Sequence, residues 1–122
     1  MVDVICDTSF LIHIANTRIK NISNIDTEIG PLNFVVPTVV LNELENLTGD
    51  PNKGIKAKST LDYIKNFKKI EISGNFADNA ILDYIRNNRG IIATIDKELK
   101  NKVKELGSSI LSVANDRILL EK

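Results

Sequence analysis

The 122-residue chain is predicted to fold as a three-layer α/β/α domain around a central, mainly parallel sheet. Short apolar runs alternate with segments whose apolar residues recur at helical spacing, which is the pattern of successive βαβ units. Several of the runs are rich in valine and isoleucine, as expected of strands that are buried on both faces. The length allows one domain over residues 1–122, without repeats or a linker.

The first half of the chain begins with a strand and a helix. Val2–Cys6 is an apolar run that predicts a buried strand, and Thr8–Asn16 has the pattern of a helix. Isoleucines at helical spacing predict a weaker helix over residues 19–29. Phe34–Val36 is a predicted strand, and Thr38 is the expected N-cap of the following helix. The apolar stripe of that helix consists of Val40, Leu41, Leu44 and Leu47.

The middle of the chain begins with a loop. Thr48–Gly54 consists almost entirely of loop-forming residues. Apolar residues at helical spacing predict a helix over Ile55–Phe67, and a short strand is expected around Ile70–Ile72. Asn75 is the expected N-cap of the next helix, which should stop before Gly90.

The last third is predicted to end in a hairpin. Ile91–Ile95 is the most strand-like run in the chain, and Asp96–Leu106 is a helix rich in Lys and Glu that a glycine closes. Two further strands, Ile110–Val113 and Ile118–Leu120, flank Asn115-Asp116, a dipeptide suited to a tight hairpin turn.

Composition and charge limit the possible functions. The chain is 43% hydrophobic and 26% charged, which is typical of a soluble globular protein. One cysteine excludes an internal disulfide framework, and with no signal segment it predicts a cytoplasmic protein. No apolar run approaches the roughly 20 residues that cross a membrane. The formal net charge of 0 lowers the odds of a nucleic-acid partner unless bound cations raise it.

Four carboxylates occupy positions where the chain passes from strand to helix, namely Asp7, Glu43, Asp78 and Asp96. In an open parallel sheet such positions face the crevice outside the carboxyl ends of the strands, where ligands bind. Converging carboxylates repel one another unless a cation neutralises them. An all-oxygen site suits one or two Mg²⁺ or Mn²⁺ ions, whose usual partner is a phosphate. The sequence therefore predicts a metal-dependent phosphodiesterase, with a nuclease as the leading interpretation.

Each acid taken alone also has a purely structural explanation. Asp7 and Asp96 could be helix N-caps, Asp78 could belong to a capping box, and Glu43 could be a solvated helix residue. The occurrence of all four at one end of the sheet favours a shared site. The helical wheel does not separate Glu43 from Glu45, because both flank the apolar stripe.

Four segments in the correct order resemble the motifs of PIN-domain nucleases. They are Ile5-Cys6-Asp7-Thr8-Ser9-Phe10-Leu11, Val36-Pro37-Thr38-Val39-Val40-Leu41-Asn42-Glu43-Leu44-Glu45, Ala77-Asp78-Asn79-Ala80-Ile81-Leu82 and Ala93-Thr94-Ile95-Asp96-Lys97-Glu98-Leu99-Lys100. The resemblance covers essentially the whole chain. The second and fourth segments are most similar to the archaeal branch related to ribosomal-RNA-processing PIN proteins, and VapC-type toxins are close relatives.

The resemblance implies a PIN-like (5′-nuclease-like) fold and an endoribonuclease that depends on Mg²⁺ or Mn²⁺ and cuts single-stranded RNA, in RNA processing or as a toxin. It selects Glu43 over Glu45, so that the catalytic and metal-binding set is Asp7, Glu43, Asp78 and Asp96. It also implies a homodimer, with an antitoxin or a ribosome-assembly protein as a further partner. The competing hypothesis is a catalytically silent PIN-like module that binds RNA or protein, but a scaffold has no reason to retain a repulsive acidic cluster.

Two further groups of polar residues accompany the acids. The hydroxyls of Thr8, Ser9 and Thr94 are expected to position water or carboxylates around the metal, although hydroxyls at helix starts are also common caps. The lysines beside the Thr48–Gly54 loop are expected to contact the RNA backbone, the alternative being a solvated surface. These lysines are Lys53, Lys56 and Lys58.

Overall fold

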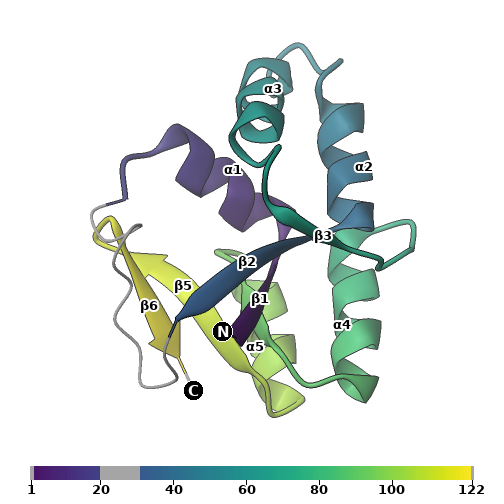
Figure 1. Cartoon of the computed structure of the whole chain (residues 1–122), viewed down its shortest axis with the longest axis vertical. Helices are drawn as coiled ribbons and strands as arrows, with labels where there is room; N and C mark the ends of the chain where they lie inside the picture. The colour runs from purple at the N-terminus through teal and green to yellow at the C-terminus, as the bar shows by residue number, and fades with distance from the viewer. Residues whose placement is uncertain (1, 20–30, 122) are drawn as a thin grey trace.

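The structure, a computed structural model, describes residues 2–19 and 31–121 and has six strands and five helices within these ranges (Figure 1). In chain order they are β1 (Val2–Cys6), α1 (Thr8–Asn16), β2 (Leu32–Pro37), α2 (Thr38–Leu47), α3 (Gly54–Tyr63), β3 (Lys68–Ile70), α4 (Ala77–Asn87), β4 (Ile91–Ala93), α5 (Lys97–Glu105), β5 (Ser109–Ala114) and β6 (Arg117–Glu121). In the described part of the chain, no helix is both long and apolar enough to span a membrane.

The strands form one sheet in the order β3-β2-β1-β4-β5-β6. All neighbouring strands are parallel except β5 and β6, which form an antiparallel hairpin. The chain runs outward from β1 to β2 and β3 and then returns to the other side of β1 as β4. The carboxyl ends of β1 and β4 therefore form the topological switch point, where an open parallel sheet places its ligand crevice. The predicted α/β class with a mainly parallel sheet is confirmed.

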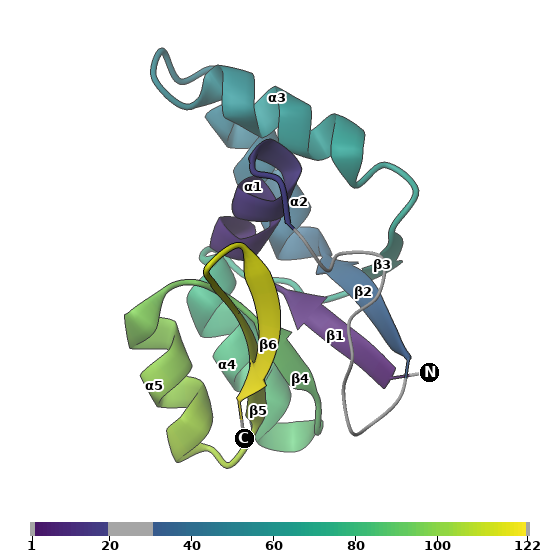
Figure 2. The same cartoon turned by 90° about the vertical axis from the view of Figure 1, so that its left-hand side faces the viewer.

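The core lies between the sheet and helices on its two sides. Figures 1 and 2 show α1, α2 and α3 grouped together, and α4 and α5 on the other side of the sheet. Phe10 of α1 packs edge to face on Phe34 of β2, with ring centroids 5.8 Å apart. Val4, Val35 and Ile92 on the central strands are fully buried. Because helices cover both faces of these strands, their carboxyl ends are the natural place for a site.

The predicted bounds of the first strand and first helix are confirmed, but those in the middle of the chain are partly wrong. The helix expected over Ile55–Phe67 ends at Tyr63, although Ile64 beyond it is still only 1% exposed. The strand lies at Lys68–Ile70 rather than around Ile70–Ile72. The Lys69 ammonium donates to three carbonyls of the intervening turn, so this turn brings β3 alongside β2 earlier than the apolar pattern suggests. The helix predicted over residues 19–29 lies outside the described residues, apart from Ile19.

The two predicted N-caps in this region, Thr38 and Asn75, are wrong. Pro37 and Phe76 are the capping positions of α2 and α4, and neither provides a side-chain cap. The Thr38 hydroxyl instead donates to the carbonyl of Ile72 at 3.0 Å and accepts from its amide at 3.2 Å. Thr38 therefore fastens the start of α2 to the segment that follows β3.

At the end of the chain the glycine stop and the hairpin are confirmed, whereas the strand predicted over Ile91–Ile95 ends at Ala93. Beyond it, the Thr94 hydroxyl accepts from the amide of Asp96 at 3.1 Å and turns the chain toward α5. Gly107 follows α5 with a φ of +81°, a left-handed conformation that glycine adopts without strain. Asn115 and Asp116 have φ values of 52° and 61°, so they form the two-residue turn that suits a twisted hairpin. This turn pairs Ala114 with Arg117 and sets the register of β5 and β6.

Candidate active site

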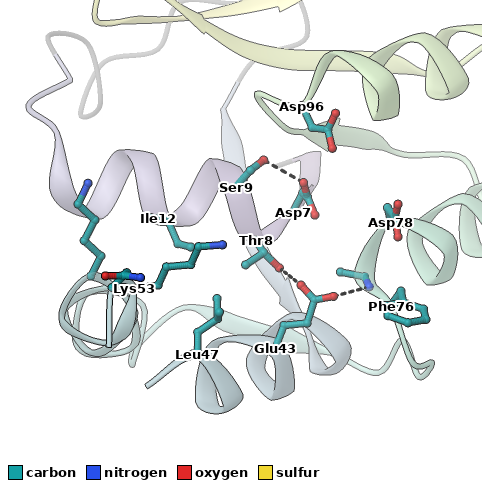
Figure 3. A pocket seen from close by; sticks show the side chains of 13 residues that line it. Asp7, Thr8, Ser9, Ile12, Glu43, Leu47, Lys53, Phe76, Asp78 and Asp96 are labelled. Atoms are coloured by element: carbon teal, nitrogen blue, oxygen red, sulfur yellow. Dashed lines mark hydrogen bonds between the residues drawn. The ribbon is translucent and has the colours of Figure 1, made fainter. Parts of the chain in front are cut away.

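A pocket of about 530 Å³ lies at the carboxyl ends of β1 and β4, and all four predicted acids line it (Figure 3). Asp7 follows β1, Glu43 lies in α2, Asp78 lies in the first turn of α4, and Asp96 precedes α5. Residues that are up to 89 positions apart in the sequence thus share one surface, as the topology of the sheet predicts.

Asp7 is the most buried of these acids, with only 6% of its surface exposed. It precedes α1 but makes no side-chain cap, so the capping explanation fails for this residue. Its Oδ2 atom accepts hydrogen bonds from the hydroxyls of Ser9 at 2.9 Å and Thr94 at 3.0 Å. Burial raises the pKa of the Asp7 carboxyl, and these two hydrogen bonds offset part of that rise. Within the described residues, no basic side chain pairs with Asp7.

Glu43 links three helices through its two carboxylate oxygens. Oε1 accepts from the Thr8 hydroxyl at 2.8 Å, and Oε2 accepts from the backbone amide of Ala77 at 2.7 Å (Figure 3). The second bond places a negative charge at the N-terminus of α4, where the helix dipole favours it. Glu45, by contrast, is exposed and does not line the pocket. The structure therefore separates two glutamates that the helical wheel left equivalent.

Asp78 and Asp96 lie in more exposed parts of the pocket wall. Oδ1 of Asp96 accepts from the amides of Glu98 at 2.9 Å and Leu99 at 3.5 Å, so Asp96 does cap α5 as its structural explanation proposed. Oδ1 of Asp78 accepts from the neighbouring Asn79 amide at 2.9 Å. In both residues Oδ2 accepts no hydrogen bond from the described residues. Each carboxylate can therefore bind a backbone amide through one oxygen and present the other oxygen to the pocket.

The donor set fits a hard divalent cation in its chemistry. Oδ2 of Asp78 and Oδ2 of Asp96 make no hydrogen bond to the described residues, and Oδ1 of Asp7 accepts from no side chain there. All three side chains line the same pocket. Oxygen-only ligands with several negative charges are those that Mg²⁺ and Mn²⁺ prefer. In their present rotamers, no three acidic, histidine or cysteine side chains within residues 2–19 and 31–121 converge tightly enough to hold one ion together. The fit to a divalent cation therefore rests on the chemistry of these oxygens and on the pocket that they share.

The three predicted hydroxyls all contact carboxylates. Thr8 donates to Glu43, whereas Ser9 and Thr94 donate to Asp7. Thr94 is fully buried and also accepts from the amide of Asp96 at 3.1 Å, which fixes the start of the Asp96 segment relative to Asp7. These side chains therefore orient the acids rather than cap helices.

Of the three predicted lysines, the structure brings two to the pocket. Lys53 and Lys56 line it, whereas Lys58 does not. Lys58 is two residues beyond Lys56 in α3 and so points about 200° away around the helix. Phe76 also lines the pocket, and sequence reasoning missed it, because nothing in the pattern distinguishes an exposed phenylalanine from a core one.

The linking role of Glu43 can be tested by stability. Replacing Glu43 by Ala should lower the free energy of unfolding by about 1–3 kcal/mol, because the Ala77 amide and the Thr8 hydroxyl lose their acceptor. Glu43→Gln should recover most of this loss, since its amide can accept from Ala77 and donate to Thr8. Exposed Glu45→Ala, the matched control, should change stability by no more than about 0.5 kcal/mol. Equal losses for the two alanine variants in urea denaturation would contradict the assigned role.

Comparisons with known proteins agree with one another. Residues 4–115 match a family model described as a PIN like domain. The chain is 36% identical over 125 aligned residues to Ribonuclease VapC4 of Methanocaldococcus jannaschii, and the match covers 93% of this chain and 91% of that protein. Its structure is similar to that of the PIN domain endonuclease Utp24, with a TM-score of 0.75 and 25% identity. That match covers 98% of this chain and 93% of the Utp24 chain.

Proposed function

Because this chain belongs to the PIN-like domain family, we propose that it is a metal-dependent endoribonuclease that hydrolyses phosphodiester bonds in single-stranded RNA. The observation that carries this proposal is that Asp7, Glu43, Asp78 and Asp96 all line one pocket at the switch point of the sheet. The names of its relatives, a ribonuclease and an endonuclease, support the same chemistry.

Asp7, Asp78 and Asp96 are the residues proposed to hold one or two Mg²⁺ or Mn²⁺ ions, and Glu43 is proposed to be a further ligand or to orient the attacking water. When bound, such an ion lowers the pKa of a water and neutralises charge on the phosphate. Ser9 and Thr94 fix one oxygen of Asp7, and Thr8 fixes Glu43 beside it. No His side chain of the described residues lines the pocket, so the hydroxyls of Thr8 and Ser9 have no histidine base to activate them and the nucleophile is proposed to be water.

The proposal is tested with a fluorescently labelled, unstructured RNA. The purified protein should cleave this RNA in Mg²⁺ or Mn²⁺ and should not cleave it in EDTA. It should cleave a fully paired duplex of the same sequence much more slowly. Recovery of cleavage when metal is added back is the control for irreversible damage by EDTA. The competing binding module would retain RNA in an electrophoretic shift without cutting it under any of these conditions.

The same chemistry serves two biological roles. A toxin of this kind is restrained by an antitoxin protein, whereas a processing enzyme works with a ribosome-assembly protein. The similarity to Ribonuclease VapC4 supports the first role. A protein encoded by the adjacent reading frame that binds this nuclease and stops RNA cleavage would assign the toxin role. We also propose a homodimer, to be measured by light scattering.

The lysines of the pocket are expected to contact the RNA backbone. Replacing Lys53 and Lys56 together by Gln should weaken RNA binding, and the slope of log affinity against log salt should flatten by about 0.7 for each phosphate that the protein no longer neutralises. Lys58→Gln is the matched control in the same helix and should leave the slope unchanged. If the double variant keeps the wild-type slope, or if Lys58→Gln flattens it equally, the RNA path runs elsewhere.

A further inference from the structure

Phe76 is a large apolar side chain that packing does not explain. It is 65% exposed, and it does not belong to the hydrophobic core. The other three phenylalanines pack against one another inside the domain, with ring centroids 5.8 Å apart for Phe10 and Phe34 and 6.2 Å apart for Phe34 and Phe67. A single exposed apolar side chain is common on protein surfaces. Among the exposed large hydrophobic side chains of the described residues, however, Phe76 is the one that lines the acidic pocket.

Hydrogen bonds fix the backbone on which this ring is carried. Phe76 immediately precedes α4, and the next amide, that of Ala77, donates to Glu43 at 2.7 Å. The ring lines both the active-site pocket and a neighbouring hollow of about 610 Å³. Phe76 therefore lies where the two spaces adjoin, as does Glu43, and Asn46 and Asn75 line the second space only.

The two sides of the pocket offer complementary chemistry to a nucleic acid strand. Figure 3 shows Lys53 on one side of the carboxylates and Phe76 on the other, next to Asp78. Lys53 and Lys56 can neutralise the charge of phosphates, whereas the phenyl ring of Phe76 can stack on the face of a base. Base faces are available only where the strand is unpaired, because a duplex stacks them internally.

We propose that Phe76 stacks on an unpaired nucleobase adjacent to the bond that is cut, and that this base occupies the hollow lined by Asn46 and Asn75. Phe76 is then a substrate-positioning residue that makes the enzyme select single-stranded RNA over duplex. The two amides supply donors and acceptors for the edge of the base. This inference rests on the proposed ribonuclease function, and it adds the chemical group by which the strand is recognised.

The kinetic test compares two substrates and three variants. The substrates are a short unstructured RNA and an abasic counterpart with the same sugar–phosphate backbone. Phe76→Leu, which keeps apolar bulk but removes the ring, should raise KM for the base-bearing RNA about tenfold, with kcat within about twofold. It should leave the abasic RNA unaffected, and Phe76→Tyr should behave as wild type on both. Tyr63→Leu removes an exposed aromatic side chain that does not line the pocket, and it should leave KM and kcat for both substrates unchanged.

A second readout does not depend on cleavage. An RNA carrying 2-aminopurine should lose fluorescence when it binds the wild type or Phe76→Tyr in EDTA, because stacking on an aromatic ring quenches this base. With Phe76→Leu the RNA should keep its fluorescence. Quenching that depends on Phe76, without any RNA cleavage by the wild type, would refute the proposed function but support the stacking. The stacking proposal is overturned by equal quenching with Phe76→Leu. It is also overturned if Phe76→Leu changes the two substrates equally, or if it abolishes only the binding of a partner protein.

Discussion

Replacing Asp7 by asparagine should reduce metal-dependent RNA cleavage by about a thousandfold or more while leaving the fold intact. The asparagine oxygen can still accept from Ser9 and Thr94, which now hold Oδ2 of Asp7 at 2.9 and 3.0 Å. The variant lacks the negative charge and the second oxygen, and several kcal/mol of metal-assisted stabilisation of the transition state correspond to this factor. The measurement is the cleavage rate of unstructured RNA in Mn²⁺, and a wild-type rate would show that the site is assigned wrongly.

The same substitution should stabilise the protein in EDTA near neutral pH. Burial raises the pKa of the Asp7 carboxyl above its unfolded value, so the folded state holds the proton more tightly than the unfolded state. The associated stability is complete below the unfolded pKa of about 3.9 and is lost as the pH rises through the higher folded pKa. Asp7→Asn removes this loss. Its melting temperature should therefore exceed that of the wild type at pH 7, and the gap should close near pH 4 in thermal melts followed by circular dichroism. A wild type that is the more stable protein in EDTA at pH 7 would refute this reasoning.

Asp96→Asn should show a crossover in thermal stability when metal is added. Without metal, the variant removes one charge from a repulsive group but keeps the cap of α5, because the asparagine oxygen can still accept from Glu98 and Leu99. We expect its melting temperature in EDTA to be about 1–3 °C above that of the wild type. In millimolar Mn²⁺ the order should reverse, because an ion at 100 times its Kd stabilises the wild type by about 2.7 kcal/mol and the variant much less.

The control for this crossover is an acid outside the pocket. Asp62 is exposed on α3 and pairs only loosely with Lys65 at 3.7 Å, so Asp62→Asn should shift in parallel with the wild type when Mn²⁺ is added. If the melting temperature of Asp96→Asn rises in parallel with that of the wild type, Asp96 only caps α5 and does not bind the metal. Differential scanning fluorimetry in EDTA and in Mn²⁺ distinguishes the two results.

Elements with local signals could be predicted from the sequence. Alternating apolar patterns located β1, α1 and the mainly parallel class of the sheet, and the Asn115-Asp116 turn located the hairpin. The positions of Asp7, Asp78 and Asp96 at or beside the starts of helices also follow from local pattern, whereas Glu43 lies in the second turn of α2. The parallel sheet then predicted that they would meet, because its strands end on the same side. Resemblance to PIN-domain nucleases supplied the choice of Glu43, and the family itself is confirmed by the match over residues 4–115.

The pairing of distant groups depends on the assembled domain and could not be predicted in this way. Thr38 and Asn75 do not cap their helices, because groups distant in the sequence make the hydrogen bonds at these helix starts. Ile72 bonds to Thr38, and Glu43, 34 residues away, binds the first amide of α4. The Thr94 hydroxyl reaches Asp7 across 87 residues. Burial of Asp7 and exposure of Phe76 are likewise properties of the assembled surface. Periodicity and capping depend on neighbours within a few residues, whereas these contacts depend on which strands the sheet places side by side.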